Sequence, residues 1–267
     1  MEFSYKLFIS VLLLLLLPIA SFSAHNSSSV YQLVCNKNFT NNNNILQVNI
    51  KNTISNLAAQ IYNNNTYAIS SFGVGYDTIY GLIQCRTDAS NESCSSCVAN
   101  AVNQIQTLCP YSSESRVWYP FCFLRYDNYK FFGQADSSYT RVWPSALTAI
   151  AHSETFNAAV GLVLDATMGS AVGKDVKIGL VLTQEVNYNR TVNGIAQCTR
   201  DLDDAGCSYC LQKALEAMSN DCKNHLGCHL ISNCCMFRYE IYDVFVEDES
   251  PNRRPAVSAL LSNGYIS

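Results

Sequence analysis

Residues 81–97 read GLIQCRTDASNESCSSC, and residues 194–210 read GIAQCTRDLDDAGCSYC. In both stretches a first cysteine is followed by a second after eight intervening residues and by a third after two more. The chain is therefore a tandem duplication, and two copies indicate a pair of domains because stacked repeat arrays need three or more units. Five cysteines of the first half recur in the second at one displacement of 113 residues: Cys85, Cys94, Cys97, Cys109 and Cys122, matched by Cys198, Cys207, Cys210, Cys222 and Cys235.

Hydrophobic periodicity within a copy predicts both helices and strands. Apolar residues recur at helical spacing over 46–61 and 94–108, which indicates two amphipathic helices. Segments rich in β-branched and aromatic residues lie between and after them and favour strands. The predicted fold class is α+β, with two tandem disulfide-stapled domains that each pack two helices on one face of an antiparallel sheet. The strands are expected at 66–72, 78–84, 116–124 and 126–132.

Composition excludes several classes of protein. With 48% apolar residues, 6 prolines and 12 glycines in 267 residues, the chain is neither disordered nor collagen-like. Lysine and arginine number 17 against 21 aspartate and glutamate, a net charge of −4 without a basic block, so no nucleic-acid partner is expected. Thirteen cysteines favour an oxidising compartment.

The amino terminus agrees with that compartment. Residues 7–20 are almost wholly apolar, Lys6 precedes them, and the small residues Ser21, Ser23 and Ala24 follow, which is typical of a cleaved secretory signal peptide at 1–23. The apolar run is shorter than the ~20 residues that a bilayer needs, and no second run of that length exists. We therefore expect a secreted, extracellular protein of the apoplast without a membrane span. Its glycosylation candidates are the sequons at Asn26, Asn38, Asn64, Asn91 and Asn189.

The duplication also predicts domain boundaries. The first domain is expected at 27–136 and the second at 146–249, joined by a linker at 137–145 and followed by a polar tail at 250–267.

The spacing Cys-x8-Cys-x2-Cys, followed by Cys-x-x-Arg-Tyr at 122–126 and 235–239, resembles the plant ginkbilobin-like, or stress-antifungal, domain. In tandem behind a signal peptide, it resembles the cysteine-rich repeat secretory proteins over nearly all of the mature chain. That family's pairing implies the disulfides Cys35–Cys109, Cys85–Cys94, Cys97–Cys122, Cys198–Cys207 and Cys210–Cys235.

The second copy departs from this pattern because it has no cysteine corresponding to Cys35. Cys222 then needs another partner, and Cys228 is favoured because related second domains often have a Gly-Cys there. This leaves Cys234 as a free thiol, or as the site of a covalent homodimer.

The resemblance also implies a ligand. In ginkbilobin, mannose is held by an Asn directly after the first cysteine, an Arg six residues before the last and a Glu five residues after it. In the first copy these positions are Asn36, Arg116 and Asp127, two identities and one shortened acid. The second copy is expected to have Ala149, His229 and Glu240 there, so the amide and the guanidinium are missing.

Other chemistries have less support. Zinc sites often use Cys-x2-Cys pairs, but each pair here belongs to its own repeat in a secreted chain, where oxidation competes with metal binding. Thioredoxin-like redox catalysis needs the two thiols of such a pair to bond each other, and the family pairing gives them different partners. Cys234 with His229 is the one candidate for a Cys–His nucleophile, and a surface histidine in a turn is the favoured interpretation.

Aromatic residues are frequent between residues 118 and 132. They are compatible with sugar binding, although packing within the sheet is the favoured interpretation. We expect no enzyme, no cofactor and no metal.

Two functions remain. The first is a secreted, non-enzymatic plant defence protein that binds mannose-type glycans weakly through its first domain, with antifungal activity as the outcome. The alternative is an apoplastic protein–protein interaction module without lectin activity, in which Asn36, Arg116 and Asp127 are a structural cluster.

Overall fold

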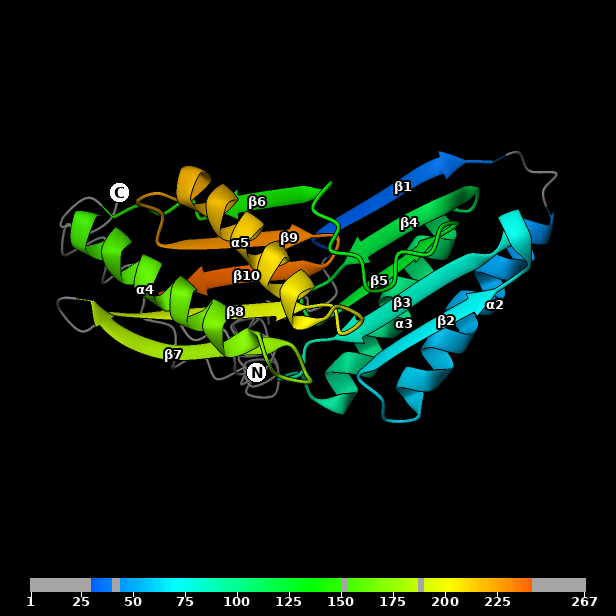
Figure 1. Cartoon of the computed structure of the whole chain (residues 1–267), viewed down its shortest axis with the longest axis horizontal. Helices are drawn as coiled ribbons and strands as arrows, with labels where there is room; N and C mark the ends of the chain where they lie inside the picture. Colours follow the sequence, from blue (N-terminus) through cyan, green and yellow to red (C-terminus); the bar gives the residue numbers. More distant parts are fainter. Residues whose placement is uncertain (1–29, 40–43, 150–152, 187–189, 242–267) are drawn as a thin grey trace, which may run out of the picture.

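A computed structural model describes residues 30–39, 44–149, 153–186 and 190–241 (Figure 1). The expected signal peptide, the polar tail and the sequons at Asn26 and Asn189 lie outside these residues. Among the described residues, no helix combines the length and the apolar character needed to cross a membrane.

The first domain contains one five-stranded antiparallel sheet in the order β1-β4-β5-β3-β2. Two long helices pack on one face of this sheet, as predicted. Its elements are β1 (Gln32–Asn38), α2 (Asn44–Tyr62), β2 (Tyr67–Phe72), the short 3-10 helix η1 (Gly75–Asp77), β3 (Ile79–Cys85), α3 (Asn91–Leu108), β4 (Ser112–Trp118) and β5 (Cys122–Asp127).

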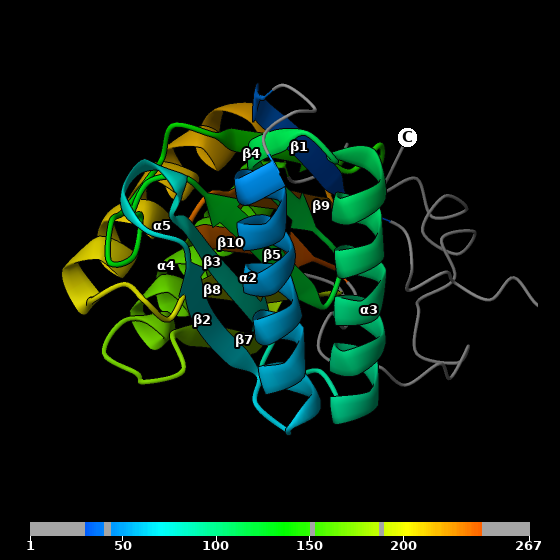
Figure 2. The same ribbon diagram turned by 90° about the vertical axis from the view of Figure 1, so that its right-hand side faces the viewer.

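The second domain repeats this architecture with the strand order β6-β9-β10-β8-β7. Figures 1 and 2 show that α2 and α3 cover one side of the molecule, whereas the helices of the second domain cover the opposite side. Its elements are β6 (Thr140–Pro144), α4 (Ser153–Ala171), β7 (Ile178–Val186), β8 (Arg190–Cys198), α5 (Asp204–Asp221), β9 (Gly227–Ser232) and β10 (Cys235–Glu240).

The repeated glycine that opens the duplicated motif sets the spacing between helix and sheet. A Cβ atom on Gly81 of β3 would lie 2.5 Å from Cγ2 of Thr53 and 2.8 Å from Cδ1 of Leu57, both on α2. At the equivalent Gly194 of β8, a Cβ would lie 2.4 Å from Oγ1 of Thr167 on α4. A side chain at either position would push the helix away, so the fold requires glycine there.

The cysteine-bearing helices begin at side-chain caps. The Oγ of Ser90 accepts a hydrogen bond from the backbone N–H of Ser93, and Asp203 Oδ1 accepts one from Gly206 at the start of α5. The buried stripe of α3 is made of Cys94, Cys97, Val98, Ala101 and Ile105. Two of these residues are disulfide-bonded to the sheet, so the same helical face supplies both core packing and cross-links.

Six disulfides are present, and they are the pairs that the family resemblance implies together with Cys222–Cys228. The two domains use the cysteine at the end of the second helix differently. Cys109 bonds Cys35 on β1, which lies opposite Ser115 of β4, whereas Cys222 bonds Cys228, which occupies the position of Ser115 in β9. Pro144 of β6 stands where the first domain has Cys35. The partner of the cysteine at the end of the second helix therefore lies on the edge strand β1 in the first domain and on β9, the strand next to the edge, in the second.

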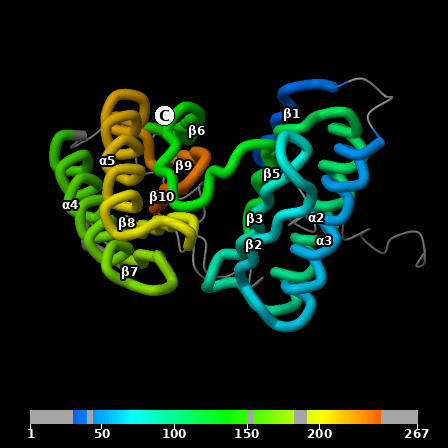
Figure 3. The backbone as a smooth tube through the Cα atoms, turned by 45° about the vertical axis from the view of Figure 1, so that its right-hand side comes forward, coloured from blue at the N-terminus to red at the C-terminus, as the bar shows by residue number. Residues whose placement is uncertain are grey.

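The predicted strands at 116–124 and 126–132 are wrong in their boundaries. The structure has a hairpin whose turn lies at 119–121, closed by a hydrogen bond from the N–H of Tyr119 to the carbonyl of Cys122 at 2.9 Å. Pro120 lacks an N–H and so favours a turn over a strand interior. Residues 128–132 are not a strand; with residues 133–139 they connect the two sheets (Figure 3).

The expected linker at 137–145 is also wrong, because β6 lies within it. This strand forms the edge of the second sheet by pairing with β9. Trp143 lies opposite His229, just as Val34 lies opposite Arg116, so Ser145 and not Ala149 corresponds to Asn36. The cysteine displacement does not extend to the first strands, because the copies differ in length upstream of the first shared cysteine.

Candidate functional site

The three residues expected to hold a sugar lie on three adjacent strands of the first sheet. Asn36 is on β1, Arg116 on β4 and Asp127 on β5. The structure brings them into one polar network, although they are not in direct contact with one another. Two residues that the sequence analysis missed, Glu114 and Lys37, make the connections.

Glu114 joins the amide to the guanidinium. Its Oε1 accepts a hydrogen bond from Asn36 Nδ2 at 3.2 Å and pairs with Arg116. Glu114 and Arg116 are two residues apart in β4, so their side chains point to the same face of the sheet. Because side chains alternate along a strand, the position of Glu114 two residues before Arg116 is the sequence signal that could have predicted its place beside Arg116.

Lys37 joins Glu114 to the acid. Its Nζ lies 3.0 Å from Oε2 of Glu114 and 3.0 Å from Oδ1 of Asp127. Burial would lower the pKa of Lys37, but hydrogen bonds to the two carboxylates raise it above the ordinary value. Burial also tends to raise the pKa of Glu114, but hydrogen bonds from Lys37 and Asn36 and the charge of Arg116 lower it overall. The network is therefore charged at neutral pH on both of these groups.

Asp127 is different because its side chain is completely buried. Burial raises its pKa above the ordinary aspartate value despite the hydrogen bond from Lys37. Its second oxygen, Oδ2, has no hydrogen bond partner among the described residues, and it lies 3.7 Å from Nη2 of Arg125. A buried carboxylate oxygen without a donor is uncommon in native proteins.

Arg116 is tied to the second domain. Its Nη1 donates a hydrogen bond to Oδ1 of Asn233 at 2.7 Å, and the amide of Asn233 donates in turn to Asp136 at 2.8 Å. The guanidinium is buried, and its Nε has no partner among the described residues. Only Asn36 and Lys37 of this network are exposed, so they form its solvent-facing rim.

Most of the aromatic run packs against the sheet. Trp118 stacks between Phe123 and Tyr139, with ring centroids 5.0 and 5.3 Å away. Arg125, the arginine of the first Arg-Tyr motif, lies 4.1 Å from the centroid of Phe131 and donates a hydrogen bond to the Tyr129 hydroxyl at 2.7 Å. These contacts fix the connection between the two sheets. Tyr129 is 39% exposed and lies beside the charged network, with Lys37 Nζ 4.7 Å from the centroid of its ring.

His229, the second-copy counterpart of Arg116, is not on the surface. It lies in β9, is 9% exposed, and contacts Tyr31 edge-on with ring centroids 4.6 Å apart. Burial, and then the charges of Arg238 and Arg86, lower the pKa of His229 to about 3. The expectation of a surface histidine in a turn is wrong, because the two domains bury this strand between them.

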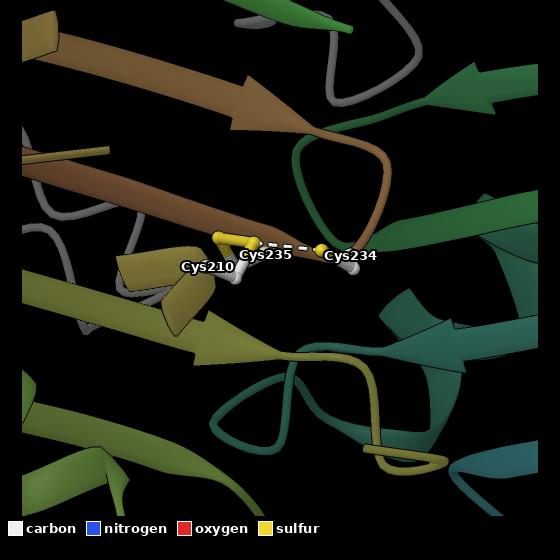
Figure 4. Close-up of side chains that lie close together, drawn as sticks. All are labelled: Cys210, Cys234 and Cys235. Atoms are coloured by element: carbon white, nitrogen blue, oxygen red, sulfur yellow. Dashed lines mark hydrogen bonds between the residues drawn. A yellow bond between two sulfur atoms is a disulfide. The ribbon is translucent and has the colours of Figure 1, made fainter. Parts of the chain in front are cut away.

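Cys234 is free and buried (Figure 4). Its Sγ lies 2.8 Å from Sγ of Cys210, which is bonded to Cys235. Burial raises the pKa of the Cys234 thiol to about 12, which opposes nucleophilic chemistry. The three sulfurs lie close enough together for a metal, but two of them are bonded to each other, so the oxidised cluster offers one thiol.

Comparison with known proteins identifies the family to which the chain belongs. The family model described as salt stress response/antifungal matches residues 34–129 and 136–242. Cysteine-rich repeat secretory protein 55 of Arabidopsis thaliana is 31% identical over 249 residues, which cover 90% of this chain and 92% of that protein. The antimicrobial ginkbilobin-2-like protein of Castanea crenata is 30% identical over 191 residues, covering 72% and 78% of the two chains.

A solved structure shares the fold. The tandem DUF26 ectodomain of a cysteine-rich receptor-like protein from Arabidopsis thaliana superposes with a TM-score of 0.69 at 24% identity. The match covers 79% of this chain and 97% of that one. At 24% identity, this similarity shows that the two chains share a fold.

Proposed function

The chain belongs to the salt stress response/antifungal family, and from that premise we propose that it is a secreted, non-enzymatic plant defence protein that binds mannose-type glycans through its first domain, with antifungal activity as the outcome. One observation carries the proposal. Buried Arg116 Nε and Asp127 Oδ2, one a donor and one an acceptor, have no hydrogen-bond partners among the described residues, and both belong to the network whose exposed members are Asn36 and Lys37. A polyol offers both kinds of partner at once.

The proposed binding step is a displacement. The Lys37 side chain is 43% exposed and spans Glu114 and Asp127, so it can swing into solvent and be replaced by sugar hydroxyls. One hydroxyl then donates to Asp127, another accepts from Arg116, and the amide of Asn36 contacts a third. Hydrogen bonds to charged groups contribute about 1.5–3 kcal/mol each, and a millimolar complex totals about 4 kcal/mol. Losing one of these contacts therefore abolishes detectable binding.

Extracellular, non-enzymatic action is supported by the chemistry of the described residues. The one thiol beside a disulfide has a raised pKa, and the one buried histidine has a pKa far below neutrality, so they do not activate each other. The sequons at Asn38, Asn64 and Asn91 are exposed, as glycosylation in a secretory route requires. Relatives of this chain are named as secretory and antimicrobial proteins.

The test is a titration of the oxidised, refolded protein with methyl α-mannoside, followed by NMR chemical shifts. We expect weak binding that Asn36→Ala and Arg116→Ala each abolish, and that Asp127→Glu strengthens because the longer side chain brings the carboxylate nearer to the rim. Asn103→Ala, an exposed asparagine on α3, and His229→Ala serve as controls and leave binding unchanged. Absence of shifts in the wild-type protein at high sugar concentration would overturn the glycan assignment.

A protein partner is the second candidate, and an exposed apolar turn favours it. Val74 is 89% exposed and Tyr76 is fully exposed in the turn between β2 and β3. Contiguous exposed apolar side chains mark contact surfaces, and these two are two residues apart in one turn. In an assay of fungal growth inhibition, loss of activity in Val74→Ser/Tyr76→Ser with full activity in Asn36→Ala would favour the interaction module, and the opposite result would favour the glycan site.

A further inference from the structure

The ammonium group of Lys37 is bound on several sides by residues of the first domain. Its Nζ lies 3.0 Å from Oε2 of Glu114 and 3.0 Å from Oδ1 of Asp127. It also donates a hydrogen bond to Oδ1 of Asn128 at 3.3 Å and lies 4.7 Å from the centroid of the Tyr129 ring. Carboxylates, an amide oxygen and an aromatic face all attract a cation, so these four residues form an ammonium site.

Lys37 reaches the ammonium site through an unusual backbone conformation. Its φ is 53°, in the left-handed region, although Asn36 and Asn38 on either side keep their register with β4. Asn36 contacts Glu114, and side chains alternate along a regular strand, so Lys37 would otherwise point to the opposite face of the sheet. Left-handed backbone is unfavourable for residues other than glycine, and such conformations cluster at ligand-binding sites. The lysine therefore resembles a ligand that the chain itself supplies.

The lysine can be replaced without opening a new cavity. Its side chain is 43% exposed, whereas the side chain of Glu114 is 11% exposed and that of Asp127 is fully buried. Because Nζ contacts an oxygen of each carboxylate, a group that takes its place contacts the same two oxygens. The lysine also leaves the site partly unsatisfied, since Oδ2 of Asp127 has no hydrogen bond partner among the described residues.

The charge of the ammonium site favours a cationic replacement. When Lys37 leaves, Glu114 and Asp127 each lose an ion pair. Burial raises the pKa of Asp127 above the ordinary aspartate value even with the lysine in place, so a neighbouring cation helps to keep this carboxylate ionised. A hydroxyl of a neutral sugar returns a hydrogen bond without the charge, whereas a protonated amine returns both ion pairs.

We propose that this site prefers an amino sugar, such as a glucosamine unit, whose ammonium replaces that of Lys37 between Glu114 and Asp127. The inference rests on the glycan binding proposed above and names the class of sugar. The pyranose ring then lies against Tyr129, which is 39% exposed. 

A lysine from a partner protein would offer the same ammonium group but no hydroxyls. The amides of Asn36 and Asn128 are exposed beside the site and suit the hydroxyl groups that surround the amine of a sugar. These amides favour the sugar over a basic segment of protein.

The probes are methyl β-glucosaminide and methyl β-glucoside, which differ only in an amine or a hydroxyl at the second carbon. Both are titrated, beside methyl α-mannoside, into the intact oxidised protein at about pH 6, where an amine of this kind is protonated. Backbone NMR shifts measure the affinities. We expect the glucosaminide to bind at least about tenfold more tightly than the glucoside, as one charge-assisted hydrogen bond implies. Upfield shifts of the sugar C–H protons should report the contact with the Tyr129 ring.

The variant Lys37→Gly removes the competing ammonium group and suits the left-handed backbone. It should bind the glucosaminide at least about tenfold more tightly than the wild-type protein does, because no ion pair has to be broken first. Lys51→Ala, at an exposed lysine of α2, is the control and should leave this affinity unchanged. In Lys37→Gly, Nα-acetyl-lysine methylamide should bind more weakly than the glucosaminide.

The outcomes separate this inference from the proposed function. Binding of the mannoside together with equal affinities for the glucosaminide and the glucoside would overturn the amino-sugar assignment and leave the glycan function standing. Binding of none of the three sugars would overturn both. In Lys37→Gly, a lysine amide that binds as tightly as the glucosaminide would overturn the assignment in favour of a basic protein partner.

Discussion

Gln84 and Gln197 occupy equivalent positions in the two copies, and each donates a hydrogen bond across the domain boundary to the carbonyl of the cysteine that follows the other. The distances are 2.9 Å from Gln84 Nε2 to Cys198 and 3.1 Å from Gln197 Nε2 to Cys85. Both glutamines are buried. Reciprocal contacts of this kind arise when two equivalent surfaces meet about a two-fold axis. The glutamine of the duplicated motif is thus an interdomain contact in both copies.

Replacing Gln84 by alanine should weaken the coupling between the domains. Its Oε1 also accepts a hydrogen bond from the N–H of Arg200 at 2.9 Å, so the substitution removes the partners of the buried Cys198 carbonyl and of the part-buried Arg200 N–H. We expect the free energy of unfolding to fall by about 2–4 kcal/mol in denaturant titrations. Gln106→Ala, at an exposed position of α3, is the control and should change it by less than about 0.5 kcal/mol. Equal stabilities of the two variants would contradict this account.

The disulfide at the end of the second helix should contribute more to the free energy of unfolding in the first domain than in the second. Cys35–Cys109 joins residues 74 apart in sequence, whereas Cys222–Cys228 joins residues six apart. In the chain-entropy model these bonds stabilise by about 4 and about 2 kcal/mol. The double variant Cys35→Ala/Cys109→Ala should therefore lose about twice as much unfolding free energy as Cys222→Ala/Cys228→Ala. A larger loss in the second variant would show that native-state contacts, not loop closure, set the difference.

The sequence predicted the elements that carry strong local signals. The helices 46–61 and 94–108 lie within the observed α2 and α3 because a buried stripe recurs along them. The edge strands β1 and β6 were missed, since their own residues are half buried or exposed and do not alternate between buried and exposed positions. The hairpin turn at 119–121 was missed because β-branched and aromatic residues continue on both sides of Pro120.

The candidate site was predictable only in part. Asn36, Arg116 and Asp127 were named from the family resemblance, but Lys37 and Glu114, which connect them, depend on the pairing of β1 with β4. The burial of His229 was unpredictable from one copy, because it arises from the docking of the two domains. A duplicated sequence gives two independent readings of one domain fold, but it says little about which surfaces of the two domains contact each other.

The free thiol should be a second partner for Cys210. Cys234 Sγ lies 2.8 Å from Cys210 Sγ, so removing the native partner leaves a thiol within bonding reach after a small movement. In Cys235→Ser, peptide mapping without reduction should find Cys210 bonded to Cys234, whereas Cys234→Ser should keep all six native pairs. A Cys235→Ser protein with two free thiols at 210 and 234 would contradict the prediction.

The same thiol should resist alkylation in the native protein. Cys234 is buried and its pKa is raised to about 12, so the reactive thiolate is scarce at neutral pH. Mass spectrometry should find no N-ethylmaleimide adduct under native conditions and one adduct per chain in denaturant. Rapid native labelling would mean that the thiol is accessible.

The buried histidine should make the protein sensitive to acid. The folded chain keeps His229 neutral down to a pKa of about 3, whereas in the unfolded chain it takes up a proton near its ordinary pKa of 6.5. The unfolded state therefore binds the extra proton between these values, and the stability of the folded state falls as pH falls from about 6.5 to about 3. The cationic Arg238 and Arg86 add to the effect, since both disfavour a charged imidazole. The loss of folding stability is up to about 5 kcal/mol over that range.

His229→Phe should flatten this part of the stability profile measured by denaturant titration at successive pH values. An unchanged slope in the variant would assign the acid sensitivity to other groups, such as Glu114, whose lowered pKa acts in the same direction at lower pH.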